Sequence, residues 1–201
     1  MRVHVVHGIL DPVGAAGILK LVPYLQDAGF DVRVPDYGLI TALETRIANP
    51  LIVRTLRPYI EPGDLYIGHS NGCAIGYDLV LGGSRPAGLV LINAALKRDI
   101  ELPALTWADV YYNDGDTATE AAIVAARLGM VDPVWGDMGH AGPVPDSSGR
   151  ILGIDCGRKS MVCDAGLLPS VSGHGDIFTA GKIEAWGPYI VDRVKTRLRS
   201  L

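Results

Sequence analysis

The chain has 201 residues, of which 48% are hydrophobic and 20% charged, and its formal net charge is −4. This length suits one domain with a sizeable core, and the composition is that of a folded globular protein and not of a disordered one. We therefore expect a single domain over residues 1–201. A negative charge without any basic block argues against nucleic acid as a partner.

The sequence also bears on the compartment and on bound metals. No stretch approaches the roughly 18 uninterrupted apolar residues of a membrane span, and the N-terminus lacks the long apolar core of a secretory signal, so we expect a cytoplasmic protein. The three cysteines, Cys73, Cys156 and Cys163, cannot all pair, and they lack metal-ligand spacing with histidine. We expect reduced, structural thiols, with Cys73 in the core, and neither a metal nor another cofactor.

The chain begins with a strand, a helix and a second strand. Residues 2–7 predict the first strand, residues 13–28 a helix that ends at Gly29, and residues 30–35 the second strand. Two strands joined by a helix pair in parallel within one sheet.

A second helical segment follows. Thr41 and Glu44 have the spacing of a capping box, which opens a helix. Because proline lacks the N–H that continues a helix, we expect an interruption at Pro50 and a second helical piece over residues 51–60.

The most informative stretch is Gly68-His69-Ser70-Asn71-Gly72. It follows a short apolar run, residues 65–67, and leads into a helix that stops at Gly82. A serine on so sharp a turn needs glycines two residues on either side, because its neighbours nearly touch the strand and the helix. The helix would point its free N–H groups at the serine oxygen. An ordinary glycine-rich turn with an incidental serine would show the same five residues.

The second half of the chain predicts further strands and helices. Residues 88–93 and 108–112 are apolar enough for buried strands, and residues 119–128 predict a helix. From residue 129 to residue 160 the pattern is lost, over a stretch too long for a routine connection. Within and after it, residues 151–155 and 161–163 predict short strands that could form a hairpin. The last predicted helix begins with Pro188 in its first turn and ends near Arg199.

With these elements in place, the chain resembles the α/β-hydrolase family, whose nucleophile elbow has the Gly-x-Ser-x-Gly pattern between a strand and a helix. The resemblance covers nearly the whole chain, from the His7-Gly8 turn to the last helix. It implies a mostly parallel central sheet with helices on both faces, in three layers. No long insertion follows the strand that ends at Asn93, so we expect a compact member without a lid and with an open site.

The family order of catalytic residues is serine, acid, histidine, each on a loop at the carboxyl end of a strand. The resemblance therefore implies Ser70 as nucleophile, Asp116 as acid and His174 as base. Asp114 stays in reserve as the acid, although Asp114-Gly115 is typical of a turn. For either aspartate, capping the following helix is the alternative role. His140 competes with His174, but the family places a further strand before its histidine.

The remaining candidates surround the serine. The family uses backbone N–H groups as oxyanion donors, which implies Ile9 and Asn71. His69 is expected to turn its side chain away from Ser70. The Trp135-to-His140 segment would be either a substrate-side loop near the acid or a surface loop.

These observations favour a serine hydrolase that cleaves a carboxylic ester through an acyl-enzyme, with a small ester or acyl molecule as its partner. The alternatives are a thioesterase or amidase with the same triad, or a binding module of the same fold that does not turn over substrate. The sequence gives no indication of the oligomeric state.

Overall fold

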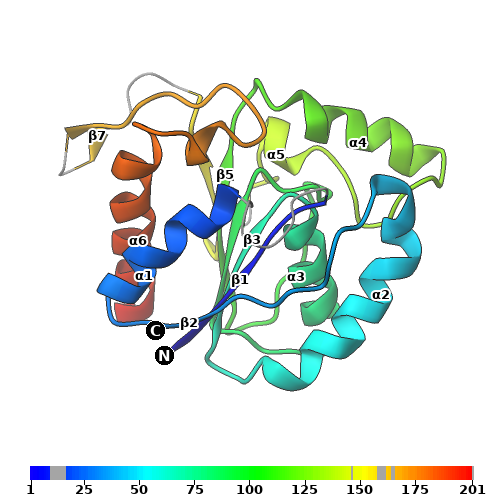
Figure 1. Ribbon diagram of the computed structural model, residues 1–201, viewed down its shortest axis with the longest axis horizontal. Helices are drawn as coiled ribbons and strands as arrows, with labels where there is room; N and C mark the ends of the chain where they lie inside the picture. Colours follow the sequence, from blue (N-terminus) through cyan, green and yellow to red (C-terminus); the bar gives the residue numbers. More distant parts are fainter. Residues whose placement is uncertain (10–16, 146, 158–161, 164–165, 201) are drawn as a thin grey trace.

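A six-stranded sheet forms the centre of the protein in the computed structural model, which describes residues 1–9, 17–145, 147–157, 162–163 and 166–200 (Figure 1). The strands are β1 (Arg2–Val6), β2 (Asp31–Arg33), β3 (Leu65–His69), β4 (Gly88–Ile92), β5 (Trp107–Tyr112) and β6 (Ile151–Asp155). Their order is β2-β1-β3-β4-β5-β6, and every neighbouring pair is parallel. The predicted α/β class with a parallel sheet is confirmed.

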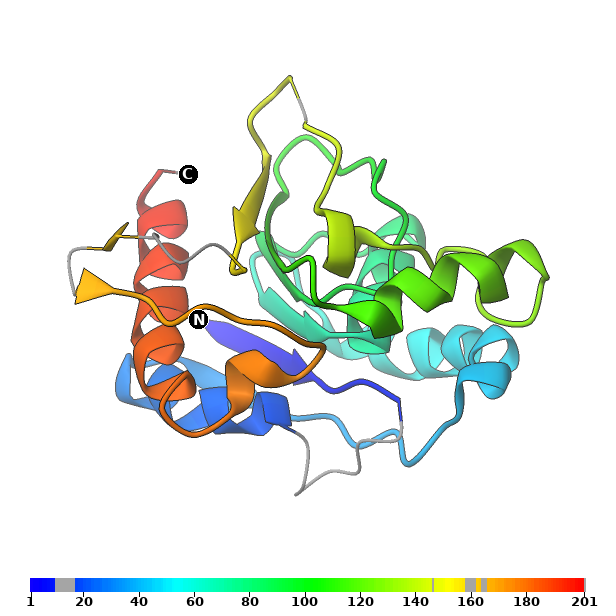
Figure 2. The ribbon, with the colours of Figure 1, turned by 90° about the horizontal axis from the view of Figure 1, so that it is seen from above.

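Helices cover both faces of this sheet, which gives the predicted three layers (Figures 1 and 2). One face carries α1 (Val22–Asp27) and α6 (Ile183–Arg199), and the other carries α2 (Thr45–Leu56), α3 (Asn71–Leu81) and α4 (Thr117–Arg127). Alternate side chains of β3 enter the two cores: Leu65 and Ile67 pack with the α1 and α6 side, and Tyr66 packs with α2 and α3. Because both faces are buried, β3 and β4 are continuous apolar strands without polar alternation.

The helices differ from the sequence prediction at three prolines. The predicted helix over 13–28 is a 3₁₀ turn, η1 (Gly17–Leu21), followed by α1 with Pro23 in its first turn; residues 10–16 lie outside the described chain. Helix α2 runs through Pro50 without the predicted interruption, and α6 begins five residues before Pro188. A helix tolerates proline where tertiary packing outweighs one lost hydrogen bond.

The capping box before α2 is present in the structure. Glu44, in the 3₁₀ turn η2 (Ala42–Glu44), accepts hydrogen bonds on Oε2 from the Thr41 N–H at 2.7 Å and from the Thr41 hydroxyl at 2.8 Å. A further 3₁₀ turn, η3 (Arg57–Tyr59), follows α2.

The stretch over 129–160 is only partly irregular. It contains a short helix, α5 (Met138–Ala141), and β6, which extends the main sheet beside β5. The hairpin prediction was wrong for β6, because its partner is β5. An antiparallel pair instead joins β7 (Val162–Cys163) to β8 (Gly166–Leu167), and the 3₁₀ turn η4 (Asp176–Phe178) precedes α6. Met161 lies outside the described residues.

The strand order reverses between β1 and β3. From β1 the chain moves outward to β2 and then returns to place β3 on the other side of β1. The strands that follow β1 and β3 in the chain, β2 and β4, therefore lie on opposite sides of this pair, and open parallel sheets bind ligands at such a switch point. Ser70 follows β3 there, and Gly8 and Ile9 follow β1.

Two further sequence predictions can be compared with the described residues. Cys73 and Cys156 are buried free thiols, with Cys73 fully buried in the core as predicted, while the Cys163 side chain is outside the described part. No helix in the described ranges is long and apolar enough to cross a membrane.

Candidate active site

Ser70 occupies the sharp turn between β3 and α3. Its backbone has φ 55° and ψ −122°, a region that costs a non-glycine residue about 1–3 kcal/mol. A Cβ on Gly72 would lie 2.4 Å from the Val6 carbonyl oxygen, and one on Gly68 would lie 2.8 Å from the Gly72 backbone. The steric need for both glycines, predicted from the spacing, is confirmed. Since α3 begins at Asn71, its positive dipole end faces Ser70.

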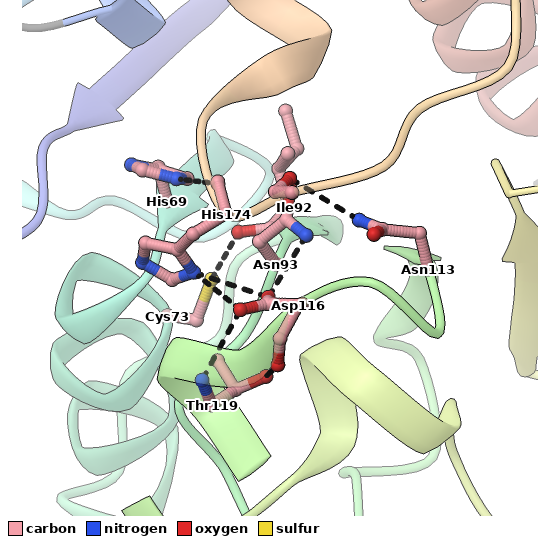
Figure 3. A network of polar contacts seen from close by, with 9 residues as sticks. His69, Cys73, Ile92, Asn93, Asn113, Asp116, Thr119 and His174 are labelled. Atoms are coloured by element: carbon pink, nitrogen blue, oxygen red, sulfur yellow. Dashed lines mark hydrogen bonds and ion pairs between the residues drawn. The ribbon is translucent and has the colours of Figure 1, made fainter. Parts of the chain in front are cut away.

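Asp116 and His174 are joined by a hydrogen bond in the loops after β5 and before α6 (Figure 3). His174 Nδ1 lies 2.9 Å from Asp116 Oδ1 and 3.0 Å from Oδ2. Since an ionised carboxylate only accepts, His174 carries its proton on Nδ1, and the lone pair on Nε2 is available as a base. The structure thus brings together the acid and the histidine that sequence reasoning selected.

The Asp116 carboxylate is fully buried and has two more donors. The Thr119 N–H donates to Oδ1 at 3.1 Å, so Asp116 also caps α4, and Asn93 Nδ2 donates to Oδ2 at 2.9 Å. Burial raises the pKa of Asp116, but the bond to His174 and these two donors outweigh it, and the pKa lies below its ordinary value. The aspartate is therefore ionised at neutral pH and oriented from three sides.

Ser70 and His174 line one cavity of about 390 Å³ beside the sheet edge. The lining residues are Gly8, Ile9, His69, Ser70, Ala95, Ala118, Thr119, Ala122, Trp135 and His174. The side chains on its wall are mostly apolar, apart from the two histidines, Ser70 and Thr119. Such a cavity suits a small apolar group next to the serine.

His69 contacts His174 directly, which the sequence did not indicate. Its Nε2 lies 2.8 Å from the His174 carbonyl oxygen, and the two rings lie 4.9 Å apart between centroids (Figure 3). Burial, and then the charge of His174, lowers the pKa of His69 to about 3, so the ring is neutral and donates its Nε2–H to that carbonyl. His69 therefore holds the backbone of the histidine loop.

The proposed oxyanion donors come from the turn after β1, which carries Ile9, and from the start of α3 at Asn71. Ile9 lines the cavity, and Asn71, as the first residue of α3, has an N–H without an intrahelical acceptor. The turn that carries Ile9 is held by Tyr37, whose ring stacks on His7 at 4.1 Å and whose hydroxyl donates to the His7 and Gly8 carbonyls. Sequence reasoning missed Tyr37, which lies in a loop without a recognisable motif.

The competing residues lie elsewhere. Asp114 is exposed, and its Oδ1 faces Gly157 and not His174. His140 is on α5 and is not among the residues that line the cavity. The family argument for His174 required a further strand before the histidine, and β6 is that strand.

The Trp135-to-His140 segment packs against the site. Trp135 lines the cavity and donates its Nε1–H to Asn71 Oδ1 at 3.0 Å. A Cβ on Gly139 would lie 2.6 Å from the Asn93 carbonyl carbon and 2.8 Å from Asp116 Oδ2. Of the two interpretations of this segment, the one that places it near the acid is correct.

No metal centre accompanies this arrangement in the described residues. Across these ranges, no group of three or more His, Cys, Asp or Glu side chains is arranged to hold a metal ion.

Comparisons with known proteins show which known fold this chain has. No protein-family model matches the chain, and no curated protein matches it. Solved structures do match over nearly the full length. An extracellular alpha/beta-hydrolase from a Paenibacillus species is 12% identical, with a TM-score of 0.56, and the match covers 98% of each chain.

Two other matches have different activities in their names. A Pyrococcus furiosus esterase is 12% identical with a TM-score of 0.57, covering 99% of this chain and 81% of the esterase. The Vlm2 thioesterase domain is 14% identical with a TM-score of 0.53, covering 96% of this chain and 91% of the domain. At such low identity the likeness concerns the fold, and it establishes that this chain has the α/β-hydrolase fold.

Proposed function

We propose that the protein is a serine hydrolase that cleaves a carboxylic ester through an acyl-enzyme. The observation that carries this proposal is the hydrogen bond between Asp116 and His174, because His174 lines the same cavity as Ser70, which lies on its strained turn. A serine hydroxyl becomes a useful nucleophile only when a base can take its proton and a third group orients that base. The likeness to esterases, although limited to the fold, agrees with this chemistry.

The reaction follows from these positions. Ser70 Oγ attacks the ester carbonyl while His174 Nε2 takes the hydroxyl proton, and Asp116 stabilises the resulting imidazolium. The Ile9 and Asn71 N–H groups stabilise the negative oxygen of the tetrahedral intermediate. Collapse breaks the bond to the alcohol, which leaves with the proton from His174. A water molecule, deprotonated by His174, then hydrolyses the acyl-Ser70 ester and regenerates the enzyme.

The cavity favours small substrates. Its volume of about 390 Å³ and its walls of alanine, isoleucine and tryptophan suit a short acyl group without charge. The absence of a lid, expected from the sequence, stays a prediction. It is checked by measuring rate against ester concentration across the solubility limit, where ordinary saturation is expected and a steep rise would indicate a lid.

Labelling with a fluorophosphonate probe, followed by peptide mapping, tests the proposal. The probe should modify wild type on Ser70 alone and should leave the Ser70→Ala variant unmodified. That variant should also lose hydrolysis of a short p-nitrophenyl ester with an unchanged circular dichroism spectrum. Unlabelled wild type without turnover of esters, thioesters or amides would refute a hydrolase and favour the binding module.

A pair of histidine variants tests the base. His174→Ala should lower kcat by about 10⁴-fold, the usual cost of losing a triad member, whereas His140→Ala should retain most of the wild-type kcat. The opposite result would place the base on α5. Rates with matched ester, thioester and amide substrates would then rank the three leaving groups.

A further inference from the structure

A network of hydrogen bonds between buried side chains connects α2 to Asn71, the residue that follows Ser70. Asn49 Nδ2 donates to Asn71 Oδ1 at 2.9 Å, and Asn71 Nδ2 donates back to Asn49 Oδ1 at 2.9 Å. Asn49 Nδ2 also donates to Asp132 Oδ2 at 2.7 Å, and Trp135 Nε1 donates to Asn71 Oδ1 at 3.0 Å. Both asparagines are fully buried, and Asp132 is 4% exposed.

The orientations of the two amides in this network are determined by the residues at its two ends, Asp132 and Trp135. Asp132 as a carboxylate can only accept, so the amide nitrogen of Asn49 must face it. Trp135 can only donate, so the amide oxygen of Asn71 must face the indole. The reciprocal pair between Asn49 and Asn71 satisfies both requirements at once. Neither amide can flip without leaving a buried polar group unpaired, which costs about 1–3 kcal/mol.

Asp132, at the other end of the network from Trp135, makes two further hydrogen bonds. The Asp132 N–H donates to Thr45 Oγ1 at 3.2 Å, and Asp132 Oδ1 accepts from the Val134 N–H at 3.1 Å. Thr45 and Asn49 lie four residues apart on α2, so one face of that helix holds both Asp132 and Asn71.

We infer that Asn49 is a positioning residue for the oxyanion hole: by holding the Asn71 side chain, it fixes the direction of the Asn71 backbone N–H. Asn71 is the first residue of α3, where the chain has only just left the strained Ser70 turn. An α-helix restrains its first residue less than its interior, because that N–H has no intrahelical partner. The side-chain bonds to Asn49 and Trp135 supply this restraint, and Trp135 is also a wall of the cavity.

The inference rests on the proposed function and is tested with Asn49→Ala. We expect kcat for a p-nitrophenyl ester to fall by about 10–100-fold with KM within about twofold, because a misdirected donor weakens only the transition state. The inhibition constant of an alkyl trifluoromethyl ketone, whose hemiketal oxygen occupies the oxyanion hole, should rise by a similar factor.

Thr106→Val is the matched control. The Thr106 hydroxyl is also buried and donates to the Pro86 carbonyl at 2.8 Å, but it lies just before β5, at the opposite end of the sheet from Ser70. Both variants should melt at lower temperature, and only Asn49→Ala should change kcat and the ketone constant. An Asn49→Ala variant with wild-type kcat and ketone affinity overturns the inference. Wild type without any turnover refutes the hydrolase proposal instead.

A swap keeps the test decisive if Asn49→Ala does not fold. Asn49→Asp alone sets two carboxylates against each other, whereas Asn49→Asp combined with Asp132→Asn restores an amide-to-carboxylate hydrogen bond between positions 49 and 132. A carboxylate at position 49 cannot donate to Asn71 Oδ1, so we expect the double variant to recover thermal stability but to keep the lowered kcat and ketone affinity. Recovery of wild-type kcat together with stability in the double variant contradicts a positioning role.

Discussion

Asp78 should make the folded protein less stable as the pH rises from about 4 to about 7. Its carboxyl lies on α3 and is hydrogen-bonded to the Asp132 side chain. Burial, and then the charge of Asp132, raises the pKa of Asp78 from 3.8 to about 7. Asp132 accepts bonds from Asn49 and from the Val134 N–H, so the proton belongs on Asp78.

The sign follows from proton binding. Between pH 4 and pH 7 the folded state keeps a proton on Asp78 that the unfolded state has released, so the free energy of unfolding falls as the pH rises. A shift of three units corresponds to roughly 4 kcal/mol, but Asp78 is partly exposed and solvent screens it. We therefore expect a loss of about 2 kcal/mol from this group, complete above pH 7.

Urea denaturation of wild type and Asp78→Asn at pH 5 and pH 8 measures this loss. The asparagine cannot ionise but can still donate to Asp132, so the variant should lose about 1 kcal/mol less than wild type between the two pH values, because over a third of the total loss already falls below pH 5. The difference between the two proteins cancels the other titrating groups, provided that the m-values agree. The same pH dependence in both would show that Asp78 and Asp132 do not share a proton.

Three further predictions test other contacts. His69→Phe keeps a ring against His174 but loses the hydrogen bond to its carbonyl, so kcat should fall by about tenfold with a small change in KM; an unchanged kcat would mean that the bond does not position the histidine. Gly139→Ala places a methyl group against the Asp116 carboxylate. The free energy of unfolding of this variant should fall by about 1–3 kcal/mol, and kcat should fall as well. Wild-type values for both would contradict the close packing. Asp109→Asn removes the buried charge that pairs with Arg193 and Arg197 on α6. Its free energy of unfolding, measured by urea denaturation, should fall by about 3 kcal/mol while kcat is retained. A loss below about 1 kcal/mol would show that these ion pairs contribute little.

The sequence predicts the parts of this fold that depend on local patterns. The continuous apolar runs of β3 and β4 indicate buried parallel strands, and the glycines around Ser70 indicate the elbow, because each constraint acts within a few residues. Pro50 shows the limit of such reasoning. The local rule breaks the helix there, but α2 continues because Ile52 and Leu56 are buried in the core beyond the proline.

Contacts between residues far apart in the sequence could be predicted from the sequence only weakly or not at all. Asn49 and Asp132 are 83 positions apart, and nothing about a lone asparagine on a helix indicates that it will meet a buried carboxylate. The choice of Asp116 and His174 succeeded in locating a hydrogen-bonded pair because the resemblance supplied an order along the chain. Asn93, which also binds Asp116, was visible only as the end of a strand.

The segment from Trp135 to His140 shows why an irregular pattern can still be tightly constrained. Periodicity reports which face of an element is buried, and this segment has no repeating face. What fixes it is close approach: Gly136 lies against the Leu96 backbone and Gly139 against Asn93, where a Cβ would lie 2.7 Å and 2.6 Å from backbone atoms. These contacts set Trp135 between the cavity and Asn71. A change in the segment should therefore alter the proposed oxyanion hole and the acyl pocket together, because one side chain belongs to both.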